Sequence, residues 1–291
     1  MDSKQKQYDV WDHSTQKMNY DIYRPKYPEE FFQKILDLLP SEKRVNYLDI
    51  ATGTGALIFP LSSHFSNISL GIDSSGSQIA TALKKVEDFK LKNLQFNMMD
   101  VLEVPNFIAK NQISKFDLIT IGQALHWFDI PVVLKMIKNE LLNENGILSV
   151  LSYACLGYEY NVKDQTKANL GYQRYQEWYE IIEKYFDCDR GALMKGFEGS
   201  PFKEIFGNME KDEKIYKNET TDVDFVKYLK TYSAYNCYCD KNSKNAGYKD
   251  PILKLEEEIK KDLANFDANE FYDLEKPLKC VTVFFQISMK N

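Results

Sequence analysis

The sequence predicts an α/β fold with a mainly parallel sheet and helices on both faces. Short runs rich in β-branched and apolar residues alternate with stretches whose apolar residues recur at helical spacing. A glycine-bearing turn directly follows the first of the β-rich runs. Because a crossover between parallel strands needs room for a helix, alternation at this spacing is typical of a parallel sheet.

The expected elements follow one another in a regular order up to Tyr153. Strands are expected at Val45–Ile50, Ile68–Ile72, Leu94–Met98, Phe116–Ile121 and Ile147–Leu151. Helices are expected at Phe31–Leu39, Ser77–Phe89 and Val132–Leu142. Beyond Tyr153 the alternation stops, and helical patterns at Gln165–Phe186, Val223–Leu229 and Ile252–Leu263 precede a final strand at Leu278–Ser288.

The helical stretch after Tyr153 is expected to be an insertion over the sheet and not an independent domain. Residues 1–291 are therefore expected to form a single domain with four parts. These are an N-terminal lid with the first helix (1–40), a ligand-binding core (41–152), a helical substrate cap (153–212) and a C-terminal part of the sheet with its helices (213–291).

Composition and charge narrow the class of protein. No stretch has the length and apolar character of a membrane-spanning helix, and the polar start at Met1–Gln7 is unlike a signal peptide, so we expect a cytoplasmic protein without membrane insertion. A net charge of −6 disfavours nucleic acid as a partner and favours a small molecule. Five cysteines and three histidines form no metal-binding pattern, so no metal is expected. The oligomeric state is left open.

A small-residue turn after the first strand is the main candidate for a binding site. It lies in the run Leu48–Gly55, which contains Asp49, Ala51, Thr52, Gly53 and Gly55. Glycine lets the backbone approach a ligand closely, and the following helix directs unpaired N–H groups towards that ligand. We expect these five residues to bind a nucleotide-like cofactor, although a single Gly-x-Gly turn is often only structural.

Two further carboxylates follow the next two strands. Asp73 ends the second strand and can accept both hydroxyls of a ribose, with Ser74 beside it. Asp100 ends the third strand and can reach an adenine amino group, with Val101 beside it. Taken alone, an aspartate after a strand is more often a turn or helix-capping residue. Together, three successive strand ends converge on one nucleoside, as expected for the carboxyl edge of an open α/β sheet.

The details of the turn separate two cofactor classes. A dinucleotide fingerprint needs a third glycine where this chain has Ile58, and Asp49 disfavours a phosphate, so an NAD-dependent oxidoreductase is the less favoured alternative. An acidic residue before a glycine-rich turn resembles the first motif of the class I S-adenosylmethionine-dependent methyltransferases. The sequence departs from that motif at Ala51, where the family usually has glycine; affinity for the cofactor would suffer if the backbone there needs a positive φ.

This resemblance implies S-adenosyl-L-methionine as cofactor and a Rossmann-like fold. Its sheet would have seven strands, mainly parallel, with the last strand, Leu278–Ser288, antiparallel to the others. A methyltransferase-like subunit without activity, serving as a scaffold, is a second alternative.

Three segments narrow the resemblance to the trans-aconitate methyltransferase-like group. They are Tyr20–Pro28, Gln123–Asp129 and Leu229–Tyr235. Because that group includes fungal enzymes acting on small carboxylic acids, the resemblance implies a small acceptor and O-methylation of a carboxylic acid to a methyl ester.

The same segments supply candidates for acceptor binding. Tyr20, Arg24 and Tyr27 combine aromatic area with one fixed cation, which suits a lid over the cofactor and a substrate carboxylate. Ser233 and Tyr235 are expected to line the acceptor pocket. The alternatives are packing of an N-terminal arm, a structural salt bridge or cofactor contact of Arg24, and a core patch at a helix end.

His126 and Trp127 are the candidate catalytic residues, because they follow the fourth strand at its carboxyl end. Gln123, just before them, is expected to contact the cofactor. His126 would act as a base for a hydroxyl or carbon acid and would only orient an ionised carboxylate, while a packed capping histidine is the structural alternative. The expected reaction is direct displacement at the sulfonium methyl, to which the protein contributes proximity, alignment and exclusion of water.

Overall fold

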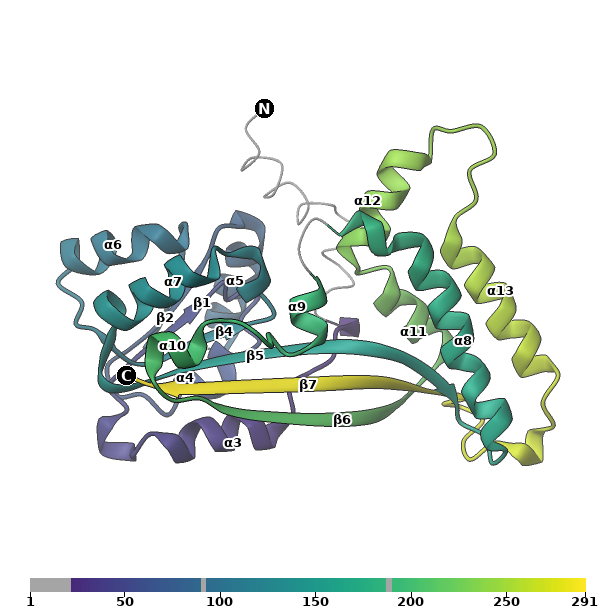
Figure 1. Ribbon diagram of the computed structural model, residues 1–291, viewed down its shortest axis with the longest axis horizontal. Coiled ribbons are helices and arrows are strands. Elements are labelled where there is room, and N and C mark those ends of the chain that lie inside the picture. The colour runs from purple at the N-terminus through teal and green to yellow at the C-terminus, as the bar shows by residue number, and fades with distance from the viewer. Residues whose placement is uncertain (1–21, 90–92, 187–189) are drawn as a thin grey trace. The chain divides into compact units, whose positions relative to one another are not determined.

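The computed structural model describes residues 22–89, 93–186 and 190–291 (Figure 1). Within these ranges seven strands form one sheet in the order β3-β2-β1-β4-β5-β7-β6. The strands are β1 (Asn46–Ile50), β2 (Ile68–Asp73), β3 (Leu94–Met98), β4 (Phe116–Gly122), β5 (Leu142–Tyr160), β6 (Glu210–Thr220) and β7 (Leu278–Lys290). Strands β3, β2, β1, β4 and β5 are parallel to their neighbours in that sequence.

Strand β7 runs antiparallel to β5. The Asn291 N–H, after the end of β7, donates to the Gly146 carbonyl near the start of β5, and the Asn161 N–H, after the end of β5, donates to the Pro277 carbonyl just before β7. The predicted seven-stranded, mainly parallel sheet with an antiparallel last strand is therefore confirmed.

The helices occupy most of the positions that the periodicity predicts. They are α3 (Glu29–Leu38), α4 (Ile58–Ser62), α5 (Gly76–Phe89), α6 (Val104–Lys110), α7 (Ile130–Met136), α8 (Gln165–Ile182), α9 (Arg190–Met194), α10 (Phe202–Phe206), α11 (Asp222–Leu229), α12 (Ser233–Asn242) and α13 (Pro251–Ala264). Helix α5 packs on β2 and β3, and α4 packs on β1 and β2. No helix in the described ranges has both the length and the apolar character needed to cross a membrane.

The chain divides into two compact units. The sheet unit comprises residues 26–89, 93–153, 190–213 and 284–291, and the helical unit comprises residues 22–25, 154–186 and 214–283. Strands β5, β6 and β7, the three long arrows of Figure 1, pass from one unit into the other. The division of the chain into a single domain with four parts stays a prediction.

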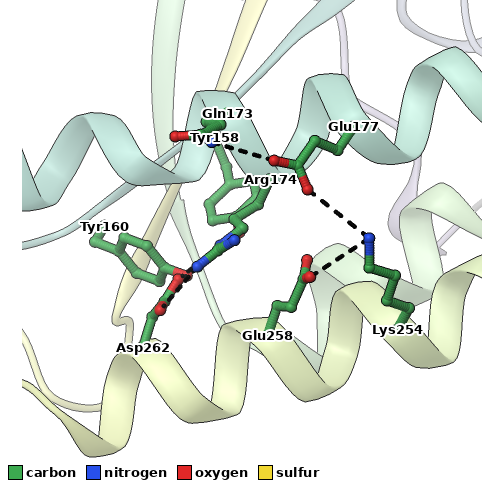
Figure 2. A network of polar contacts seen from close by, with 8 residues as sticks. All are labelled: Tyr158, Tyr160, Gln173, Arg174, Glu177, Lys254, Glu258 and Asp262. Carbon is green, nitrogen blue, oxygen red and sulfur yellow. Dashed lines mark hydrogen bonds and ion pairs between the residues drawn. The ribbon is translucent and has the colours of Figure 1, made fainter.

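A buried polar network joins α8, α13 and the end of β5 within the helical unit (Figure 2). The Tyr160 hydroxyl donates to Asp262 at 2.9 Å, and Arg174 donates to both oxygens of the same carboxylate at 3.1 and 3.3 Å. The Tyr158 and Tyr160 hydroxyls lie 3.4 Å apart. Because Asp262 is buried, its charge depends on these donors for the solvation that water would otherwise provide.

Replacing Asp262 by asparagine is expected to lower the free energy of unfolding by about 2 kcal/mol, because Arg174 loses its counter-charge. The loss stays below that of a fully buried pair, since a quarter of the Arg174 side chain is exposed (26%). Urea denaturation of the full chain measures it. The control is Glu258→Gln, which breaks a 3.6 Å ion pair with the exposed Lys254 and should cost less than about 0.5 kcal/mol. Equal losses in the two variants would contradict the buried-network interpretation.

Candidate active site

Residues from neighbouring parallel strands meet at the carboxyl edge of the sheet. In the β1–β2 pair Ile50 lies opposite Ile72, and in the β1–β4 pair it lies opposite Ile121. The segments that follow β1, β2 and β4 therefore leave the sheet side by side. This is the edge at which the sequence predicts the cofactor site, and all of it lies in the sheet unit.

The turn after β1 has an unusual backbone. Ala51, Gly53 and Gly55 have φ values of +52°, +57° and +93°. The Thr52 N–H donates to the Ile72 carbonyl at 2.8 Å, which ties the turn to β2. A Cβ on Gly53 would have its nearest neighbour 3.9 Å away, whereas a Cβ on Gly55 would lie 2.3 Å from the Phe59 ring. The backbone at Gly53 is therefore not crowded, and its nearest neighbour at that distance is the Gln78 side-chain oxygen.

Ala51 departs from the family motif at a position with a left-handed backbone. An L-residue in this conformation costs about 1–2 kcal/mol. Ala51→Gly is therefore expected to raise the free energy of unfolding by about 0.5–1 kcal/mol, because relief of strain exceeds the greater freedom that glycine gives the unfolded chain. Thermal or urea denaturation checks this. A destabilised Ala51→Gly variant would show that the turn is not strained at this residue.

Asp49 is a buried carboxylate at the centre of the edge. It accepts hydrogen bonds from the Thr52 hydroxyl at 2.6 Å and the Thr120 hydroxyl at 2.5 Å. Burial raises the pKa of Asp49 to about 7; the two threonine hydroxyls lower this pKa, and the charge of Asp73 raises it further. A carboxylate in this state gains most from a cationic ligand, which would restore the charge that burial disfavours.

Asp73 is the last residue of β2 and is hydrogen-bonded to the turn that follows β1. Its two oxygens accept from the Gly53 N–H at 2.8 Å and the Ser75 N–H at 2.8 Å. Burial raises the pKa of Asp73, and hydrogen bonds from the backbone of Ser75, Gly53 and Ser74 oppose that rise. The side chain of Ser74 is exposed. Asp73 therefore lies directly beside Gly53 of that turn.

Asp100 follows β3 and caps a short 3₁₀ helix, Val101–Glu103. One of its oxygens accepts from the Leu102 N–H at 2.9 Å, and Val101 is buried. One oxygen of Asp100 thus caps a helix, which is the structural alternative that the sequence leaves open for this residue.

The segment after β4 carries Gln123, His126 and Trp127. His126 and Trp127 lie in a 3₁₀ turn, Leu125–Trp127, with ring centroids 5.2 Å apart, and both are half-buried. Gln123 has a φ of +56°, and its carboxamide bonds to the backbone of Tyr153. The candidate catalytic residues His126 and Trp127 therefore belong to the same edge as the turn after β1.

Tyr27 also belongs to the sheet unit. Its ring packs edge-on against Tyr153 and Phe284, with centroids 5.8 and 6.2 Å away. A Cβ on Gly122, the last residue of β4, would come within 3.3 Å of the Tyr27 hydroxyl. Tyr27 therefore lies at the carboxyl end of β4, beside the segment that holds His126.

Three of the other predicted acceptor residues lie in the helical unit, and Tyr20 lies outside the described residues. Arg24 donates to the Thr231 carbonyl at 2.9 Å. Ser233 is buried at the start of α12, and the Tyr235 hydroxyl donates to Asp250 at 2.9 Å.

Arg24 has two aromatic neighbours, of which Tyr232 lies in the predicted segment Leu229–Tyr235 and Tyr228 lies just before it. Its guanidinium lies 5.6 Å from the centre of the Tyr232 ring and 6.0 Å from that of Tyr228. In the sequence, the four-residue spacing of these two tyrosines within a tyrosine-rich run is the feature that could have identified them as a pair.

The residues at this edge fit a nucleoside that carries a cationic amino group. The uncrowded backbone at Gly53 offers contact, Asp73 borders it with acceptor oxygens, and Asp49 is a buried carboxylate suited to a cation. With its order β3-β2-β1-β4-β5-β7-β6 and antiparallel β7, the sheet and this edge define a class I methyltransferase, the class whose methyl donor is S-adenosylmethionine.

Comparisons with known proteins agree with this class. The chain belongs to the methyltransferase domain family, which matches residues 41–231. It is 26% identical over 261 residues to a candidate methyltransferase of Dictyostelium discoideum, covering 86% of each chain. A candidate type II methyltransferase from Anaeromyxobacter dehalogenans has a similar fold, with a TM-score of 0.64 at 15% identity, covering 92% of this chain and 98% of that one.

Proposed function

We propose that the protein transfers a methyl group from S-adenosylmethionine to a small-molecule acceptor, with a carboxylic acid as the acceptor class and a methyl ester as product. The observation that carries the proposal is the left-handed turn Ala51–Gly55 between two carboxylates, Asp49 and Asp73. In this assignment Asp49 holds the amino group of the methionine moiety, Asp73 the ribose hydroxyls and Asp100 the adenine amino group.

When bound, the cofactor supplies a methyl group that its sulfonium charge already activates. The chain then has to align the acceptor and exclude water, which is the task assigned to the His126–Trp127 turn and to Tyr27. A carboxylate acceptor is ionised near pH 7 and needs no base, so His126 donates a hydrogen bond and orients it. For a hydroxyl acceptor, His126 would remove the proton from the attacking oxygen.

An anionic acceptor is supported by the surroundings of Arg24 in the helical unit. Two tyrosine rings and the Thr231 carbonyl fix the direction of its guanidinium. Arg24 is proposed to bind the acceptor carboxylate, with Ser233 and Tyr235 as the other predicted residues of that pocket. Membership of the trans-aconitate methyltransferase-like group, the cytoplasmic location and the absence of nucleic acid among the partners stay predictions.

Calorimetric titration with S-adenosylmethionine and S-adenosylhomocysteine tests the proposal, with a nicotinamide dinucleotide as control. We expect micromolar affinity for the first two ligands and none for the third. Incubation with S-adenosylmethionine and trans-aconitate, followed by mass analysis for a methyl ester, then tests the acceptor class. Affinity for the nicotinamide cofactor alone would indicate an oxidoreductase, and no binding at all would indicate a scaffold.

A further inference from the structure

The carboxamide of Gln123 continues the pairing of β4 with β5 beyond the end of the backbone ladder. The last paired residues are Gly122 and Leu151, and the Gln123 N–H adds one more bond, to the Leu151 carbonyl at 2.8 Å. Beyond it, the Gln123 Nε2 donates to the Tyr153 carbonyl at 2.8 Å, and its Oε1 accepts from the Tyr153 N–H at 2.9 Å. A carboxamide has the same donor and acceptor as a peptide group, so the side chain takes the place of the next residue of β4.

This arrangement lets the main chain leave the sheet one residue early. Gln123 does so with a φ of +56°, a conformation that is costly for a residue other than glycine. Ala51, which follows the adjacent strand β1, has a φ of +52°. Backbone strain at neighbouring strand ends is typical of functional sites, where surrounding contacts maintain it. For Gln123 those contacts are the two hydrogen bonds to Tyr153.

The early exit leads directly into the turn that carries His126 and Trp127. Within that turn the Trp127 N–H donates to the Ala124 carbonyl at 2.9 Å, and Leu125 is fully buried. At its other end Asp129 caps α7 by accepting from the Val132 N–H at 3.3 Å. The segment is thus fixed at both ends, by a side-chain clamp and by a helix cap.

We propose that Gln123 is a positioning residue, whose carboxamide clamps Tyr153 and thereby fixes His126 and Trp127 for alignment of the acceptor. This role differs from the cofactor contact that the sequence predicts, because both polar atoms of the carboxamide are engaged with Tyr153. It rests on the proposed function, in which His126 and Trp127 face the acceptor.

The test uses the full chain labelled with 5-fluorotryptophan. The sequence has three tryptophans, so each gives one ¹⁹F resonance, and Trp127→Phe assigns the one of interest. Gln123→Asn tolerates a left-handed backbone but is too short to span both atoms of Tyr153. The matched control is Gln112→Asn, at an exposed glutamine with a φ of +55° after α6. Trp178, buried in the helical unit, serves as an internal reference.

In Gln123→Asn we expect the ¹⁹F resonance of Trp127 to shift, and the change of its chemical shift between H2O and D2O to increase about twofold. The Trp178 resonance should be unchanged. The affinity for S-adenosylhomocysteine should stay within about fivefold of wild type. Gln112→Asn should match wild type in every measurement. An unchanged Trp127 resonance, or an affinity loss of more than about fivefold, would overturn the proposal. Failure of the wild type to bind S-adenosylhomocysteine would instead refute the proposed function, and the Trp127 measurement does not depend on it.

Discussion

Replacing Asp49 by asparagine is expected to stabilise the protein by about 2 kcal/mol at pH 8 and to weaken binding of S-adenosylmethionine by about 100-fold. The two effects have one cause. Burial raises the pKa of Asp49 to about 7, so the free protein gains from a neutral side chain at this position. The Thr52 and Thr120 hydroxyls can rotate to serve an amide. A cationic amino group, in contrast, needs the carboxylate.

The stability effect has a definite pH dependence. At a pH well below 3.8 Asp49 is protonated in both the folded and the unfolded chain. Between its usual pKa of 3.8 and the folded value of about 7, the unfolded chain loses the proton and the folded chain keeps it, so the wild type loses stability as the pH rises. The loss levels off once the pH is well above 7, at a total on the order of 4 kcal/mol. Asp49→Asn should lack this slope.

Cofactor affinity should change with pH in the opposite direction. Below pH 7 a cation must displace the proton of Asp49, so wild-type affinity falls by up to about tenfold per pH unit, whereas that of Asp49→Asn stays flat. Urea denaturation and calorimetry from pH 5 to pH 8 measure both quantities. The control is Asp117→Asn, which makes the same change of charge near the amino end of β4, away from the carboxyl edge of the sheet. A variant that binds as tightly as wild type would remove Asp49 from the cofactor site.

The centre of the parallel sheet was predictable because strands β1 and β4 are buried on both faces. Such strands form short apolar runs, and β1 begins only one residue later than expected. Strand β3, an edge strand with alternating buried and exposed residues, has the expected bounds. Strand β6 was missed, because as an edge strand it carries alternating charges that resemble a loop.

Strand β5 was expected to end at Leu151, but it continues to Tyr160. The extension includes the buried carboxylate of Glu159, a residue type that is rare in buried strands. Its charge is satisfied by Lys217 of β6 at 2.6 Å and by the Tyr172 hydroxyl at 3.0 Å, partners that no local pattern reveals.

In the candidate site, the backbone conformation was predictable from sequence and the tertiary partners of its side chains were not. Glycines and a preceding aspartate indicate a left-handed turn at a strand end, and the structure has that turn, including at Ala51. The carboxamide of Gln123 could not be assigned from sequence, because its partner Tyr153 lies thirty positions away on another strand. The placement of Arg24 beside Tyr228 and Tyr232 likewise depends on contacts between distant segments.

Replacing Asp73 by alanine is expected to weaken binding of S-adenosylmethionine by more than about 100-fold, the largest loss of affinity of any single change. The carboxylate is proposed to accept both ribose hydroxyls, and it also holds the Gly53 and Ser75 N–H groups that shape the turn. The variant should lose about 1–2 kcal/mol of stability as well, since two backbone donors lose their acceptor.

A weakly binding variant could therefore reflect either a damaged fold or a damaged site, and Asp117→Ala separates these causes. Asp117 lies in the same sheet and accepts the Val45 and Asn46 N–H groups at 3.1 and 2.9 Å. Its replacement should cost similar stability and leave cofactor affinity unchanged. Asp73→Asn, which retains one acceptor oxygen, should recover most of the stability and little of the affinity. If Asp117→Ala lost affinity in proportion to its stability, the effect of Asp73→Ala would be explained by the sheet alone, and the ribose assignment would fail.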